Sequence, residues 1–104
     1  MSRHYNKLVR DKIPEIIENS GKKAITTVLN QEEYLTELDR KLNEECAEYQ
    51  QDKSIEELAD MLEVIYAITV ARGYSVEELE QVRREKAEKR GGFNGRIFLK
   101  EVIE

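Results

Sequence analysis

Apolar residues recur at helical spacing through the middle of the chain. Between residues 31 and 50 they follow one another at intervals of three or four, which predicts a long amphipathic helix. The series is Leu35, Leu38, Leu42, position 45 and Tyr49. Position 45 holds a glutamate, and burying an unpaired carboxylate is costly or shifts its pKa. Glu45 is therefore the sharpest local anomaly in the pattern.

A second helix is predicted from Ser54 to about Arg72. The run Ser54-Ile55-Glu56-Glu57 matches a capping box, and Gly73 supplies the stop. Apolar residues wrap most of the circumference, which predicts a central, buried helix. Asp60 is one of only two charges between residues 58 and 71.

The flanking segments predict shorter elements. A first helix is expected over residues 6–19, with its regular part starting near Pro14, because proline is favoured in a first turn. A polar helix is expected from the capping box at Ser75 to about Arg90. Residues 23–29 and 96–103 are rich in β-branched and apolar residues, and could pair as two short strands.

Together these patterns predict an all-α fold. We expect a helical bundle built on an antiparallel helix hairpin, with a minor two-stranded β element. A length of 104 residues allows one domain, 1–104, with a modest core. One proline and five glycines leave little to interrupt long helices.

Composition also bears on location and partners. The one cysteine, Cys46, excludes an internal disulfide and is expected to be a packing residue, which fits a reducing cytoplasm. The N-terminus lacks an apolar leader core, and no apolar stretch is long enough to span a bilayer. The net charge is −5 with no basic stripe, which argues against nucleic acid as a partner. We expect a cytoplasmic protein without membrane contact.

Four carboxylates carry the strongest chemical signal. Glu45 and Glu48 share one helix face, as do Glu57 and Asp60, because each pair is three residues apart. A reversal near residues 52–53 would set Glu48 against Glu57 and Glu45 against Asp60. Four like charges repel one another, so a cation between them is expected, and oxygen-only ligands suit Mg²⁺, with Mn²⁺ as the alternative.

Simpler interpretations of these acids exist. Acidic residues three apart are common on solvated helix faces. Glu57 can be explained by its place in the capping box of Ser54. Glu45 and Asp60 resist the simpler interpretation because they interrupt apolar faces.

Basic residues form two further groups. Lys86 and Arg90 are four apart beside Gly91-Gly92, where they could contact phosphates. The simpler interpretation is favourable placement of cations at a helix C-terminus. Lys7, Arg10 and Lys12 form the other group, for which a solvated helix face is the simpler interpretation.

The acidic motifs resemble a known family. Glu44-Glu45-Cys46-Ala47-Glu48, followed by Glu57-Leu58-Ala59-Asp60, resembles the EExxE…ExxD signature of the MazG-like all-α NTP pyrophosphohydrolases. The opening KLVRDKIPEII and the closing KxxxRGGF, residues 86–93, resemble its small phosphoribosyl-ATP pyrophosphohydrolase-like branch. The resemblance covers almost the whole chain. The eight residues 49–56 that separate the acidic motifs are fewer than in the wider family, so pocket details of longer members do not transfer.

The resemblance implies a Mg²⁺-dependent enzyme that forms a homodimer or a dimer of dimers. Such enzymes cleave the α–β phosphoanhydride of a nucleoside triphosphate or a phosphoribosyl-ATP-like nucleotide and release pyrophosphate. It implies Glu45, Glu48, Glu57 and Asp60 as metal ligands, with Glu45 and Glu48 also catalytic. Lys86 and Arg90 would bind the substrate. The alternative function is a non-catalytic helical regulatory module that binds nucleotide and metal.

Overall fold

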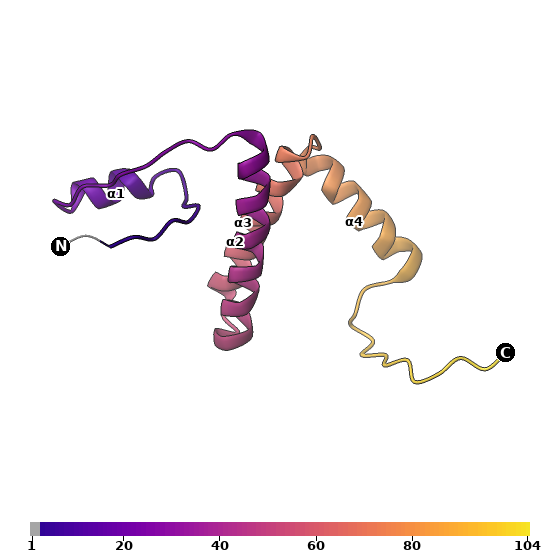
Figure 1. The fold of residues 1–104 in the computed structure, drawn as a ribbon. Coiled ribbons are helices and arrows are strands. Elements are labelled where there is room, and N and C mark those ends of the chain that lie inside the picture. The colour runs from indigo at the N-terminus through magenta and orange to yellow at the C-terminus, as the bar shows by residue number, and fades with distance from the viewer. Residues whose placement is uncertain (1–2) are drawn as a thin grey trace.

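The computed structural model describes residues 3–104, and this part of the chain contains helices and no strands (Figure 1). The helices are α1 (Ile13–Asn19), α2 (Gln31–Asp52), α3 (Ile55–Ala71) and α4 (Val76–Arg90). The predicted all-α class is therefore confirmed for the described residues. The bounds of α2, α3 and α4 lie within two residues of those predicted.

The three longer helices begin at side-chain caps. The Asn30 side chain accepts a hydrogen bond from the Glu33 N–H at 2.9 Å, and the Glu33 carboxylate accepts one from the Asn30 N–H at 3.1 Å. Ser54 and Ser75 accept hydrogen bonds from backbone N–H groups of α3 and α4 in the same way. These contacts satisfy amide groups that would otherwise lack partners, so they fix where each helix starts.

The first helix starts at Ile13 with Pro14 in its first turn, which confirms the prediction that its regular part begins near Pro14. The earlier part of the predicted range, residues 6–12, is not helical. A proline inside a helix clashes with the carbonyl four residues earlier, so the segment before it cannot continue the helix. Residues 3–12 instead form an extended N-terminal segment, with Asn6 at a φ of 47°.

The predicted two-stranded β element is wrong. Residues 23–29 and 96–103 are without regular structure, and they lie on opposite sides of the helices in Figure 1. Most of their apolar side chains are exposed, including Val28 at 97% and Ile97 at 91%. β-Branched residues favour a strand only when a partner strand and a packed face are present, and these segments have neither.

Helices α2 and α3 form the main packing unit. They lie side by side in Figure 1, and α4 contacts α3, whereas α1 packs against none of the other described helices. At one end of the pair, the Gln31 side chain donates a hydrogen bond to the Ala71 carbonyl at 2.8 Å. At the other end, Lys53 and Ser54 connect the helices, with Lys53 in the left-handed conformation. Leu38 of α2 and Val64 of α3 are buried in this unit.

The chain buries little apolar surface by itself. Among hydrophobic residues, only Leu38 and Val64 are buried within residues 3–104. The accessible surface is 9817 Å². A compact protein of this mass, 12.2 kDa, exposes roughly 6,000 Å². Helix α3, predicted to be central, leaves Ile55, Leu58 and Leu62 exposed on one side.

None of the described helices combines the length and the apolar content that a membrane crossing requires.

Replacing Leu38 with alanine tests the packing of α2 on α3. Leu38 is 2% exposed. Removing its side chain leaves a cavity, and we expect the free energy of unfolding to fall by about 2–4 kcal/mol. Thermal and urea unfolding followed by circular dichroism measure the change. Val28→Ala, at an exposed position, is the control and should change stability by less than about 0.5 kcal/mol. Equal effects of the two variants would contradict the assignment of the core.

Candidate functional site

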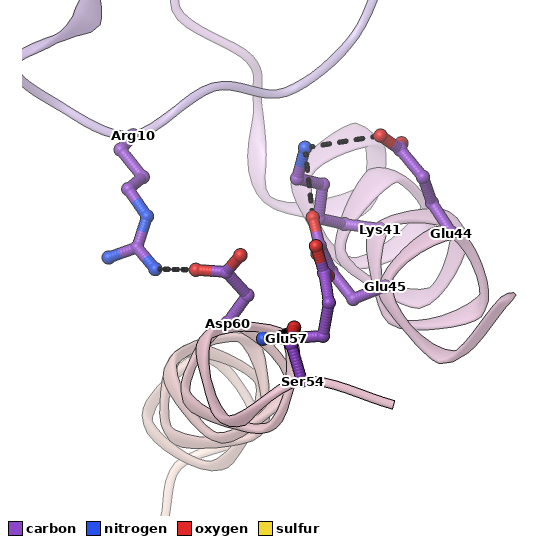
Figure 2. Close-up of polar contacts among 7 residues, drawn as sticks. All are labelled: Arg10, Lys41, Glu44, Glu45, Ser54, Glu57 and Asp60. Carbon is purple, nitrogen blue, oxygen red and sulfur yellow. Dashed lines mark hydrogen bonds and ion pairs between the residues drawn. The ribbon is translucent and has the colours of Figure 1, made fainter. Parts of the chain in front are cut away.

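The turn between α2 and α3 brings the predicted carboxylates together. One oxygen from each of Glu45, Glu57 and Asp60 lies within 4.8 Å of the others. A second group, Glu44, Glu45 and Glu48, meets the same limit, so Glu45 belongs to both. We call these five residues the acidic cluster. Figure 2 shows Glu45 reaching from α2 toward Glu57 of α3.

Glu45 is the buried member of the acidic cluster. Glu45 is only 6% exposed, which fits its place in the apolar series of α2. Glu45 Oε2 and Glu57 Oε2 are buried and have no hydrogen-bond partner within the described residues. A buried carboxylate oxygen without a partner loses its hydration without compensation. A cation or a proton at these two oxygens would supply that compensation.

Burial and crowding shift the acidity of this pair. Burial, contacts with Glu45 and Glu48, and the negative charges of these two residues together raise the pKa of Glu57 to about 7, with burial as the largest cause. Burial also raises the pKa of Glu45; Glu48 adds to this rise, while contact with Glu57 and the charge of Lys41 oppose it. Two carboxylates this close do not both ionise readily, so they hold a proton between them near neutral pH.

Three cations surround the acidic cluster. Arg10 Nη2 donates a hydrogen bond to Asp60 Oδ1 at 2.6 Å, and Lys7 Nζ lies 3.6 Å from Glu44 Oε1. Lys41 Nζ lies 3.5 Å from both Glu44 Oε1 and Glu45 Oε1 (Figure 2). Each cation offsets part of the repulsion among the acids.

Sequence reasoning missed Lys41 and undervalued Arg10. Lys41 stands three and four residues before Glu44 and Glu45 on the same helix, a spacing that predicts contact and was readable from the sequence. Arg10 was expected on a solvated helix face. Its contact with Asp60 joins residues 50 positions apart, so only the tertiary structure reveals it.

The predicted phosphate contacts lie apart from the acidic cluster in the single chain. Lys86 and Arg90 are exposed on the second half of α4. Helix α4 starts beyond the far end of α3 and leads away from it in Figure 1. One chain therefore does not bring Lys86 and Arg90 to the carboxylates.

Two surface hollows also lie elsewhere. One of about 450 Å³ runs along α4, and its lining residues are Glu77, Gln81, Arg84, Glu85 and Glu88. The other, about 270 Å³, is formed by residues between Gly92 and Phe98. Neither includes a residue of the acidic cluster.

The donor set fits a hard divalent cation. Every donor is a carboxylate oxygen, as Mg²⁺ and Mn²⁺ prefer, and two buried oxygens lack partners. Glu45, Glu48, Glu57 and Asp60 are the residues that would hold such an ion. Ser54 keeps Glu57 in place, since its hydroxyl accepts a hydrogen bond from the Glu57 N–H at 3.3 Å. Unlike Glu33 in the cap of α2, the Glu57 carboxylate forms no hydrogen bond with the N–H of its cap residue within the described part of the chain, so its side chain belongs to the acidic cluster and not to a capping box.

Comparison with known proteins adds little to this geometry. No family model matches the chain, and no solved structure matches it. A stretch of 41 residues is 51% identical to an uncharacterised protein of Mycolicibacterium smegmatis (strain ATCC 700084 / mc(2)155). The matched stretch covers 39% of this chain and 42% of that protein. The match therefore assigns neither a family nor an activity.

The raised pKa values predict how stability depends on pH. The pKa of Glu57 rises from 4.5 to about 7, so the folded chain binds more protons than the unfolded chain between these values. Its contribution to stability is complete below 4.5 and is lost as the pH rises through about 7. Glu57→Gln removes this loss. In metal-free buffer, the unfolding midpoint of this variant minus that of wild type should increase as the pH rises from about 5 to about 8.

Glu63→Gln is the matched control, since Glu63 is an exposed carboxylate of α3 outside the acidic cluster. Its midpoint should follow that of wild type across the pH range. A constant difference between Glu57→Gln and wild type at every pH would refute the proton sharing.

Proposed function

We propose that this chain is a Mg²⁺-dependent nucleotide pyrophosphohydrolase, with Mn²⁺ as the alternative ion. It would cleave the α–β phosphoanhydride of a nucleoside triphosphate or a phosphoribosyl-ATP-like nucleotide and release pyrophosphate. The observation that carries the proposal is the buried Glu45 among Glu48, Glu57 and Asp60, because its Oε2 has no hydrogen-bond partner within the described residues. The resemblance of residues 44–48 and 57–60 to the EExxE…ExxD signature supports it.

The acidic cluster would bind the ion at the turn between α2 and α3. A bound divalent cation lowers the pKa of water and offsets charge on phosphoryl oxygens. Glu45, Glu48, Glu57 and Asp60 would supply the ligands, and the rigid pair of helices would keep them in place. Because the ligands come from both helices, the site depends on the packing of α2 on α3.

Glu45 and Glu48 would also position the attacking water. With the ion bound, the carboxylates of Glu45 and Glu48 would be ionised and could accept the proton of the water as it attacks. The water oxygen bonds to a phosphorus of the α–β bridge, and its proton passes to the carboxylate. The bridging bond breaks, and the products are a nucleoside monophosphate and pyrophosphate.

The proposal includes assembly with a second copy. The chain exposes roughly 3,000 Å² or more beyond the surface of a compact protein of its mass, an area on the scale of obligate homodimer interfaces. The exposed row Ile55, Leu58 and Leu62 of α3 supplies apolar surface for such an interface. We propose a homodimer or a dimer of dimers, in which the antiparallel hairpin of α2 and α3 becomes part of a helical bundle.

Assembly also offers a route for Lys86 and Arg90 to reach substrate. They lie apart from the acidic cluster of their own chain, so these residues would approach the cluster of a neighbouring copy. There they would bind phosphate oxygens, Arg90 through two N–H groups at once.

A non-catalytic regulatory module is the second candidate. The observation that favours it is that Lys7, Arg10 and Lys41 already pair with members of the acidic cluster. The same residues would then bind metal and nucleotide without turnover. Calorimetry of nucleotide binding, run beside a pyrophosphate assay, separates the two functions.

Replacing a cluster carboxylate should abolish turnover. We expect Glu45→Gln and Asp60→Asn to lower kcat by about 100-fold or more, because each removes a ligand charge. The assay follows Mg²⁺-dependent pyrophosphate release from a panel of nucleoside triphosphates and phosphoribosyl-ATP. Glu63→Gln, outside the acidic cluster, should retain wild-type activity. Absence of turnover by folded, Mg²⁺-loaded wild type on the whole panel would overturn the enzymatic function.

Metal binding should reverse the effect of the clustered charges on stability. Without metal, replacing Glu45, Glu48, Glu57 and Asp60 by their amides removes repulsion and should raise the unfolding midpoint. Saturating Mg²⁺ should stabilise wild type by about 2–3 kcal/mol at 100 times its dissociation constant, and the quadruple variant much less. Thermal melts with and without Mg²⁺ measure both effects. A Mg²⁺ response that is equal in the two proteins would rule out the acidic cluster as the binding site.

A further inference from the structure

The extended N-terminal segment, residues 3–12, carries two cations to the acidic cluster from outside the helices. Arg10 contacts Asp60 of α3, and Lys7 contacts Glu44 of α2. The segment thus reaches both helices of the pair, one ion pair to each. Figure 2 shows the Arg10 side chain extending from this segment to Asp60.

These ion pairs hold the segment only weakly. Helix α1, which follows the segment, packs against no other described helix, so it adds no anchor. The side chains of Arg10 and Asp60 are 57% and 37% exposed, and those of Lys7 and Glu44 are 45% and 36% exposed. Exposed ion pairs contribute about 0–1 kcal/mol, so another anion can take the place of either carboxylate.

Arg10 has unused capacity to bind an anion. Its contact with Asp60 uses Nη2, while a guanidinium carries five N–H donors in a planar fork that matches phosphate oxygens. Lys41 differs, because its side chain is 18% exposed and lies between Glu44 and Glu45. Among the cations at the acidic cluster, Arg10 and Lys7 are therefore the ones free to turn to a ligand.

We infer that Arg10, assisted by Lys7, binds the phosphate chain of the nucleotide at the acidic cluster. This inference rests on the proposed function, which supplies the phosphate. A divalent cation bound at the acidic cluster lowers the net negative charge there. Asp60 and Glu44 then attract Arg10 and Lys7 less strongly. The triphosphate, with several charges, then becomes the stronger partner. The N-terminal segment thereby supplies phosphate contacts within the same chain, which Lys86 and Arg90 do not.

The test measures nucleotide affinity in Arg10 and Lys7 variants. We expect Arg10→Gln to raise KM for the nucleotide, and the dissociation constant of inorganic triphosphate on the Mg²⁺-loaded protein, about 10-fold. The value of kcat should change less than about 3-fold, since Arg10 binds the ground state as well. Arg10→Lys should restore part of the affinity, and Lys7→Gln should show a smaller loss than Arg10→Gln.

Lys12→Gln is the matched control. Lys12 is the last residue of the same segment, is exposed, and forms no ion pair with another described residue. It should leave both constants unchanged. Thermal melts of all variants confirm folding, and calorimetry with Mn²⁺ measures metal affinity directly.

The outcomes separate this inference from the proposed function. If wild type binds triphosphate without hydrolysing any nucleotide, the enzyme proposal fails while the Arg10 effect on binding supports the inference. If wild type turns over nucleotide and Arg10→Gln keeps its KM, the inference alone fails. If Arg10→Gln tightens Mn²⁺ binding and leaves triphosphate binding unchanged, Arg10 is a counter-ion only and the inference is overturned. Absence of any triphosphate binding to wild type also overturns it.

Discussion

The close approach of Glu45 and Glu57 across the α2–α3 contact is the constraint on which the rest of the structure depends. Packing Leu38 and Val64 into the pair of helices carries these two carboxylates inward with them. A proton held by the pair and three nearby cations reduce the resulting repulsion. Lys41 comes from the same helix, and Arg10 and Lys7 come from the N-terminal segment. The conformation of residues 3–12 is therefore tied to the charge state of the helices.

Local signals in the sequence predicted the helices well. The capping-box motifs at Ser54 and Ser75 predicted the starts of α3 and α4, where each serine side chain accepts a backbone N–H bond, because a side-chain cap acts within a few residues. The position of Glu45 in an apolar series predicted its burial, since helical periodicity decides which face turns inward. The strands at 23–29 and 96–103 were wrong, because residue preference for β structure has no effect without a partner strand.

Contacts between distant segments could not be predicted in this way. The four predicted carboxylates do come together, because helical periodicity places each pair on one face and α2 packs directly on α3. Arg10 lies in an extended segment whose path the periodicity of the helices does not fix, so its contact with Asp60 was not foreseen. The exposed apolar residues of α3 show a related limit. The sequence predicted burial of that face, and a single chain does not provide it.

The connection between α2 and α3 has a consequence for how related sequences can differ in length. Only Lys53 and Ser54 lie between the two helices, so an inserted residue has no loop to occupy and must extend one helix. Each added residue turns the side chains beyond it by about 100°. An insertion would therefore turn Glu57 and Asp60 away from Glu45, and one placed after Ser54 would also change the turn that Ser54 caps. Among chains that share this two-residue connection, insertions and deletions should therefore accumulate in residues 20–30 and 91–104, while the spacing between the two acidic motifs stays constant.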